Sequence, residues 1–252
     1  MATEIVGPFD DKVWQILKEC GTLRIGHFVF TAGDHSNSYV DKVEATDDPI
    51  ARKKLAFLLE NAIIKHLPGF IKEGTIVGTP MGAISLATTL SDITDCQLAF
   101  LEKKARLVKD ENEVITGIEY YLALRGANLK RVKGRKVFLI EDVITSGKTT
   151  TEALDVLRAN GADIVGMSCI ANRKGWTPPE WMEVFVQLAV KPPDIEIVSW
   201  PPEECPLCDE LIDTMGEAGT PINIDCGHGE DFLAAITDEN RRKVLAGKHL
   251  LG

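Results

Sequence analysis

Two adjacent carboxylates, Glu141 and Asp142, stand between an apolar run and a small polar turn. The apolar residues 137–140 are typical of a buried strand, and the turn that follows contains hydroxyl side chains around Gly147. From Thr151 onward, apolar residues recur at helical spacing. A strand, a polar turn and a helix in this order present free backbone N–H groups and a positive helix end to a phosphate.

The two carboxylates need a different partner, because a phosphate would repel them. A metal ion, or a group that donates hydrogen bonds such as a ribose hydroxyl, meets this need, so a phosphorylated ribose fits the whole stretch. We predict that Glu141 and Asp142 hold the ribose hydroxyls, directly or through Mg²⁺. The predicted 5-phosphate turn consists of Thr145, Ser146, Gly147, Lys148 and Thr149.

The tetrapeptide 146–149, Ser-Gly-Lys-Thr, also looks like the end of a nucleoside-triphosphatase phosphate loop. That loop requires a glycine five positions before Gly147, and the sequence has Asp142 there. A carboxylate at this position would crowd and repel a triphosphate. We therefore set the triphosphatase interpretation aside.

The order and spacing of this segment resemble the signature of the type I phosphoribosyltransferases, which bind 5-phosphoribosyl 1-pyrophosphate (PRPP). The resemblance implies an enzyme that transfers the 5-phosphoribosyl group of PRPP to a nitrogenous base and releases pyrophosphate, with Mg²⁺ as cofactor. It also implies a homodimer.

A second glycine-containing turn, Gly78–Gly82, lies between a predicted strand and a predicted helix. Glycine permits unusual backbone angles and close approach to a ligand. In the family the corresponding turn holds the pyrophosphate, which assigns Thr79, Pro80, Met81 and Gly82 to PRPP binding.

Two basic residues, Lys103 and Arg125, are the catalytic candidates that the resemblance implies, because both would contact the pyrophosphate. A guanidinium can bind pyrophosphate oxygens in a bidentate manner. The polar run 105–116 between them looks like the family's mobile loop, which would close over the site and protect PRPP from water.

The N-terminal segment 26–42 resembles the opening of the orotate phosphoribosyltransferases and of related proteins, and the whole resemblance spans most of residues 20–175. It implies that the base is bound by Thr31, Ser36, Tyr39 and Lys42. The chain departs from the orotate enzymes at two positions: they carry a lysine in place of Thr31 and an arginine in place of Glu102. The missing cations argue against a well-tuned site for a carboxylated pyrimidine. His27 and His35, which flank the turn, are interpreted as packed or solvated histidines rather than as catalysts.

Strands and helices alternate along most of the chain, which predicts an α/β fold with a central parallel sheet flanked by helices. Ligands of such sheets sit beyond the carboxyl ends of the strands, where both glycine-containing turns fall. We predict a phosphoribosyltransferase domain at 1–202 with a small N-terminal hood at about 20–45, and an irregular C-terminal appendage at 203–252. The predicted strands are 26–31, 38–43, 75–77, 97–101, 118–124, 137–140, 163–171, 183–190 and 195–200, and the predicted helices are 10–20, 48–65, 84–90 and one from residue 151.

The net charge of −10 argues against a nucleic-acid partner for the surface as a whole. The segment 125–136 runs against this average, with six basic residues and no acidic one. It is interpreted as a solvated basic turn or as an attractor for a polyanionic substrate. It is also the only support for an alternative function, a PRPP-sensing regulator that binds nucleic acid or a partner.

Six cysteines occur in a chain of 252 residues without a signal-like N-terminus or an apolar run long enough to span a membrane, which predicts a cytoplasmic protein with reduced thiols. Four residues of the C-terminal part have the types and partly the spacing of a structural zinc site. They are Cys205, Cys208, Cys226 and His228. Reduced structural cysteines are the alternative.

Overall fold

The computed structural model describes residues 3–29, 34–40, 42–111, 113–172, 175–189, 198–201 and 204–207. The chain divides into two compact units. The first comprises Met1–Ile16 and Thr46–Pro193, and the second comprises Leu17–Ala45 and Asp194–Gly252. Each unit has a sheet of its own. Among the described residues, no helix combines the length and apolar character needed to cross a membrane.

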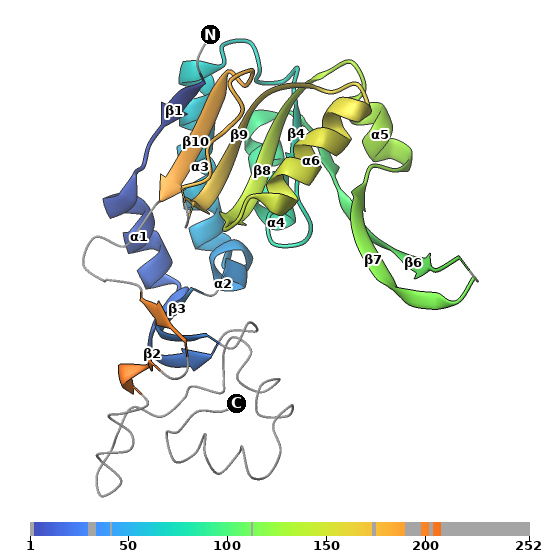
Figure 1. The fold of residues 1–252 in the computed structure, drawn as a ribbon. Coiled ribbons are helices and arrows are strands. Elements are labelled where there is room, and N and C mark those ends of the chain that lie inside the picture. The colour runs from blue at the N-terminus through green and yellow to red at the C-terminus, as the bar shows by residue number, and fades with distance from the viewer. Residues whose placement is uncertain are drawn as a thin grey trace, which may run out of the picture. The chain divides into compact units, whose positions relative to one another are not determined.

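The first unit contains a six-stranded sheet in which every neighbouring pair is parallel, as the sequence predicts (Figure 1). From one edge to the other, the strands are β1 (Glu4–Val6), β10 (Val184–Ala189), β9 (Asp163–Asn172), β8 (Lys136–Ile144), β4 (Thr75–Gly78) and β5 (Gln97–Phe100). The edge strand β1 was not predicted, because three residues are too few to show a period of two.

Helices cover both faces of this sheet: Figure 1 shows α6 in front of it, with α3 and α4 behind. The helices are α1 (Asp10–Glu19), α2 (Lys42–Asp47), α3 (Pro49–His66), α4 (Ile84–Thr94), α5 (Gly126–Val132) and α6 (Lys148–Ala159). Asp48 caps α3: its Oδ1 atom accepts hydrogen bonds from the N–H groups of Ile50 and Ala51 at 2.8 and 2.6 Å. Helix α6 begins at Lys148, three residues before the predicted start.

Strand β8 is buried on both faces, which explains why it reads as a continuous apolar run. Val137 and Leu139 join a buried cluster with Leu154 and Leu157 of α6. Phe138 points to the other face, where its ring meets that of Phe70 edge-on at 6.0 Å. The two packed faces fix the register of β8, and with it the position of the residues at its carboxyl end.

The predicted mobile loop 105–116 has strand residues at both ends, 105–109 and 115–116, and its closing over the site stays a prediction. Strands β6 (Glu102–Lys109) and β7 (Ile115–Ala123) form an antiparallel hairpin, with Arg106 paired to Glu119 across it. Most side chains of β6 are exposed, so the strand shows no apolar alternation from which it could have been recognised.

The second unit contains a three-stranded antiparallel sheet with the order β11-β3-β2. Strands β2 (Leu23–Val29) and β3 (His35–Val40) are the predicted hood strands, and β11 (Ser199–Trp200) is the described part of the last predicted strand. The Ser36 hydroxyl donates to the Val198 carbonyl at 2.8 Å. The predicted appendage 203–252 lies outside the described residues except for residues 204–207.

Candidate active site

The two predicted ligand-binding turns meet at the carboxyl edge of the parallel sheet, through strands β4 and β8. Gly78 is level with Ile140 in the register, and the Thr79 N–H donates to the Ile140 carbonyl at 3.0 Å. The Thr79 hydroxyl donates to Glu141 Oε1 at 2.7 Å. A residue of the predicted pyrophosphate turn is thus bonded directly to one of the predicted ribose ligands.

Glu141 is a buried carboxyl group, and of its two oxygens only Oε1 has a hydrogen-bond partner among the described residues. Burial, reinforced by the neighbouring Asp142 carboxylate, raises the pKa of Glu141 to about 8. Its Oε1 also accepts the Asp142 N–H at 3.0 Å, whereas Oε2 is buried and has no hydrogen-bond partner among the described residues. Once ionised, the carboxyl group therefore has an oxygen that can bind a hydroxyl group or a metal ion.

Asp142 also lies at the base of the site, and Gly82 leaves room for it. The Asp142 Oδ1 atom accepts the Val143 N–H at 2.6 Å. A Cβ atom on Gly82 would lie 2.1 Å from Asp142 Oδ2, so no other residue fits there unless the carboxylate moves. Close approach explains this glycine, as the sequence predicts.

Gly147 combines a left-handed backbone with a tight contact. Its φ is +76°, and a Cβ atom would lie 2.0 Å from Cδ1 of the Trp176 ring. Trp176 is held in place by Asn172 Oδ1, which accepts the Trp176 N–H at 2.9 Å. Sequence reasoning missed Trp176, because it follows the strand by several residues in a stretch without periodicity.

The other residues of the predicted 5-phosphate turn surround the start of α6. Thr145, Ser146, Lys148 and Thr149 are exposed, and Gly147 provides no side-chain cap for the helix. The Lys148 N–H donates to the Ser146 hydroxyl at 3.4 Å, and the positive end of α6 faces this exposed turn, where it can attract an anion.

Lys103 and Arg125 are both exposed. Lys103 lies near the start of β6, and Arg125 follows the end of β7. The Leu101 N–H donates to the Gly78 carbonyl at 3.1 Å, so β6 starts beside the predicted pyrophosphate turn. Lys103 Nζ lies 4.9 Å from the centre of the Tyr120 ring, and Arg125 precedes α5. Glu102 is paired with Lys104, whose ammonium group lowers the pKa of Glu102.

The predicted base-binding residues belong mainly to the second unit. Ser36 is buried and hydrogen-bonded to Val198, and the ring of Tyr39 stacks on Phe28 with 5.7 Å between the ring centres. Lys42 opens α2, and Thr31 lies outside the described residues. Their role in base binding stays a prediction.

Of the four predicted zinc ligands, Cys205 is buried, and Cys208, Cys226 and His228 lie outside the described residues. Cys205 Sγ lies 3.5 Å from Nε2 of His27. His27 and His35 are packed histidines, as predicted, and both are fully buried.

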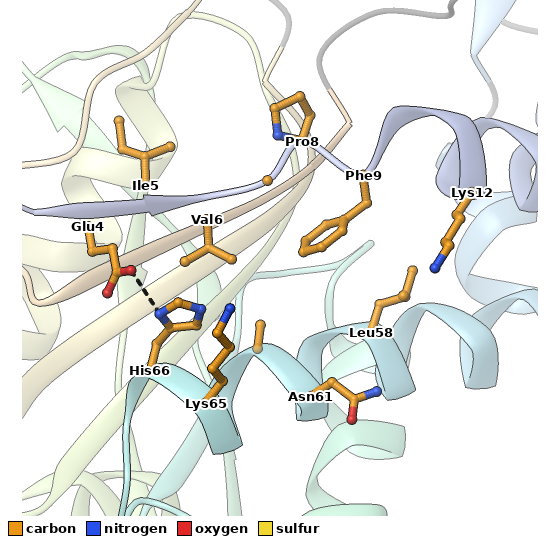
Figure 2. A pocket seen from close by; sticks show the side chains of 12 residues that line it. Glu4, Ile5, Val6, Pro8, Phe9, Lys12, Leu58, Asn61, Lys65 and His66 are labelled. Carbon is orange, nitrogen blue, oxygen red and sulfur yellow. Dashed lines mark ion pairs between the residues drawn. The ribbon is translucent and has the colours of Figure 1, made fainter.

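A separate pocket of about 600 Å³ lies between β1 and α3. Figure 2 shows Glu4 of β1 facing His66 of α3, and His66 Nδ1 lies 2.9 Å from Glu4 Oε1. None of the predicted PRPP-binding residues lines this pocket. This pocket is therefore separate from the predicted PRPP site at the carboxyl ends of the strands.

Comparison with known proteins agrees with this geometry. Residues 45–203 match the family described as the phosphoribosyl transferase domain. An orotate phosphoribosyltransferase of Pyrococcus horikoshii is 33% identical over 66% of this chain and 80% of its own length. One of Heliobacterium modesticaldum is 28% identical over 79% of this chain and 93% of its own length.

Solved structures share the fold at low identity. The orotate phosphoribosyltransferase of Mycobacterium tuberculosis H37Rv in complex with inorganic phosphate is 18% identical, with a TM-score of 0.51 over 72% of this chain and 97% of its own. The adenine phosphoribosyltransferase of Leishmania tarentolae is 16% identical, with a TM-score of 0.51 over 76% of this chain and 95% of its own. Because the family match spans more than half of the chain, with five of the six strands of the parallel sheet and both glycine-containing turns, the chain belongs to the phosphoribosyltransferase family.

Proposed function

We propose that the protein transfers the 5-phosphoribosyl group of PRPP to a nucleobase, with orotate as the base to test first, and releases pyrophosphate. The observation that carries the proposal is the 2.7 Å hydrogen bond from Thr79 to Glu141. It joins the turn suited to pyrophosphate to the carboxylates suited to the ribose, which are the two parts of PRPP that flank the reacting carbon.

Each part of the site has a task in this reaction. Glycosyl transfer passes through a transition state with oxocarbenium character, in which negative charge develops on the leaving pyrophosphate. Lys103 and the N–H groups of Met81 and Gly82 would stabilise that charge, with Arg125 as a second cation. The turn around Gly147 would hold the 5-phosphate and so orient the ribose.

The residues present also fit a magnesium ion bound together with PRPP. Carboxylate oxygens are ligands that Mg²⁺ prefers, and Glu141 Oε2 is a buried oxygen without a hydrogen-bond partner among the described residues. Glu141 and Asp142 would hold the ion or the ribose hydroxyls. The ion itself would offset charge on the pyrophosphate.

Orotate is the first base to test because the relatives described above carry that name. Two residues argue for a weaker orotate site than theirs: Thr31 and Glu102 stand where orotate enzymes place cations. A carboxylate that enters a partly buried site needs a cation or several N–H donors. Lys42 is the residue that we propose as a substitute.

The decisive experiment is a base screen with the purified protein, PRPP and Mg²⁺. Orotate, uracil, adenine, guanine, hypoxanthine and xanthine are offered one at a time, and nucleotide and pyrophosphate are measured together. Base-dependent release of both products in equal amounts supports the proposal. PRPP binding without turnover on any base would favour the regulatory alternative instead.

The basic segment 125–136, the sole support for that alternative, is partly engaged in structural contacts. Arg131 Nη1 donates to the Leu98 carbonyl at 2.9 Å, and Arg135 Nη2 donates to the Glu73 carbonyl at 2.8 Å. Homodimerisation, which the family resemblance implies, and the cytoplasmic location predicted from the sequence are part of the proposal. Light scattering after size exclusion tests the first, and cell fractionation the second.

A further inference from the structure

Three buried side chains of the second unit lie close together, and none of them has a role in the proposed transfer reaction. They are His27 on β2, His35 at the start of β3, and Cys205, which follows β11. Their solvent exposure is 0%, 0% and 1%. One nitrogen from each histidine and the cysteine sulfur all lie within 4.8 Å of one another.

We propose that His27, His35 and Cys205 bind a structural zinc ion. The donor set suits the metal, because zinc takes imidazole nitrogen and thiolate sulfur in closed structural sites. The proposal does not depend on the transfer reaction.

Two of the distances between the ligand atoms are close to those that a tetrahedral ion needs, and all three ligand atoms lie within 4.8 Å of one another. Bonds of about 2.0–2.1 Å to nitrogen and about 2.3 Å to sulfur place two such ligand atoms roughly 3.3–3.6 Å apart. Cys205 Sγ lies 3.5 Å from His27 Nε2, and His35 Nδ1 lies 2.9 Å from the same nitrogen. Zinc binding requires the two imidazoles to separate by a few tenths of an ångström.

The ion would join parts of the chain that are far apart in the sequence. His35 is in register with Val29 of β2 and with Trp200 of β11. The proposed ligands therefore come from the middle strand β3, from its neighbour β2 and from the segment that follows β11. In small units a metal bond is a common substitute for a large core. The described residues supply three ligands. Cys208 has the zinc-knuckle spacing from Cys205 but lies outside them, so the proposal rests on the three alone.

Metal analysis of the full-length protein, expressed with added zinc, is the first test. We expect about one zinc per chain in the wild type. The variants Cys205→Ser and His27→Gln should lose it, with zinc affinity lowered by more than the roughly 10- to 100-fold that outer-shell changes cause. Cys20→Ser is the matched control, because Cys20 belongs to the same unit and is not among the three residues. Wild-type protein without bound metal, or with copper in place of zinc, would overturn the proposal.

Cobalt substitution keeps the test decisive if a variant folds poorly. Cobalt added to chelator-treated wild-type protein should give the d–d bands of a tetrahedral site and a sulfur-to-cobalt charge-transfer band. Cys205→Ser should lose at least half of the charge-transfer intensity, whereas Cys20→Ser should keep it all. An unchanged cobalt spectrum in Cys205→Ser would mean that the trio is only a hydrogen-bonded cluster, and that any metal binds elsewhere. Turnover is not part of either readout, so failure here leaves the proposed transfer reaction untouched.

Discussion

Glu141 and Asp142 are neighbours in the sequence but have different surroundings. Glu141 is held by the Thr79 hydroxyl and by a backbone N–H, in a place where burial dominates its titration. Asp142 turns to the backbone of Val143 and lies against Gly82. The pair therefore combines Glu141, whose raised pKa opposes ionisation, with Asp142, which contacts the backbone and Gly82 instead.

The raised pKa of Glu141 predicts a specific pH dependence of stability. Because its pKa is about 8 in the folded protein against an ordinary value of 4.5, the folded state binds the proton more tightly than the unfolded state. The resulting stability is fully present below pH 4.5 and is lost as the pH rises through 8, by up to about 1.4 kcal/mol per pH unit. Glu141→Gln cannot ionise, so urea titrations at pH 6 and pH 8 should show a smaller difference for this variant than for the wild type. Equal differences in both proteins would contradict the prediction.

At Asp142 the expected effect is on binding. Asp142→Asn keeps an oxygen for the Val143 N–H but loses the charge, so the fold should persist while PRPP affinity falls by about 1–3 kcal/mol. Calorimetric titration of PRPP with Mg²⁺ measures this. The control is Asp155→Asn, an exposed carboxylate on α6, which should leave the affinity unchanged. Unchanged affinity in the Asp142 variant would remove the residue from the proposed ribose site.

At the scale of elements, the turn between β8 and α6 packs against Trp176, and Gly147 lies so close to the Trp176 ring that a side chain would overlap it. Gly147→Ala should abolish 5-phosphate binding for two reasons. The left-handed backbone costs about 1–2 kcal/mol for a residue with a Cβ atom, and that atom would overlap the Trp176 ring. In a Trp176→Ala background the second cost disappears and the first remains. The loss of stability on Gly147→Ala should therefore be smaller in that background, as measured by thermal unfolding; a loss of equal size would show that the ring is not the obstacle.

The hairpin β6–β7 allows a test of leaving-group stabilisation. Lys103→Ala should lower the turnover number more than it raises the Michaelis constant for PRPP, if the ammonium group chiefly meets charge that develops in the transition state. Lys109→Ala removes another lysine of β6 that is paired with Glu113, and should change little. A rise in the Michaelis constant alone would assign Lys103 to ground-state binding.

The sequence predicts best the elements that combine a clear apolar pattern with a polar or proline residue marking where the pattern begins or ends. Strand β8 and helix α3 are recognisable because an apolar pattern ends at carboxylates in one case and begins at Asp48-Pro49 in the other. Strand β6 was missed because its side chains are exposed on both faces, and α5 because its sequence reads as a basic turn. The convergence of His27 with Cys205 depends on a contact between residues 178 positions apart, which no local pattern can indicate.

At the scale of the whole molecule, the fold does not select the base. Structures named for orotate and for adenine resemble this chain with equal TM-scores of 0.51. We propose that selectivity comes from a few side chains, among them Thr31 and Glu102, where the sequence resemblance predicts cations in the orotate enzymes.

We expect orotate to be used, but with a Michaelis constant above that of the relatives assayed in parallel. Thr31→Lys should lower that constant, because the added ammonium group can meet the carboxylate of the substrate. Steady-state kinetics with orotate and with uracil, which lacks the carboxylate, measure the effect. The improvement should be confined to orotate; an equal change for both bases would show that residue 31 does not recognise the carboxylate.

Strand β1 has a consequence for how the protein is made on the ribosome. It precedes the other described strands in the chain, and it pairs with β10, about 180 residues later. At about 5–20 residues per second, roughly 10–40 seconds pass between the emergence of the two partners. Strands β2 and β3 likewise precede β11 by more than 150 residues. Both sheets therefore have an open edge through most of translation, and a nascent chain stalled before residue 184 should bind chaperones that the released protein no longer binds.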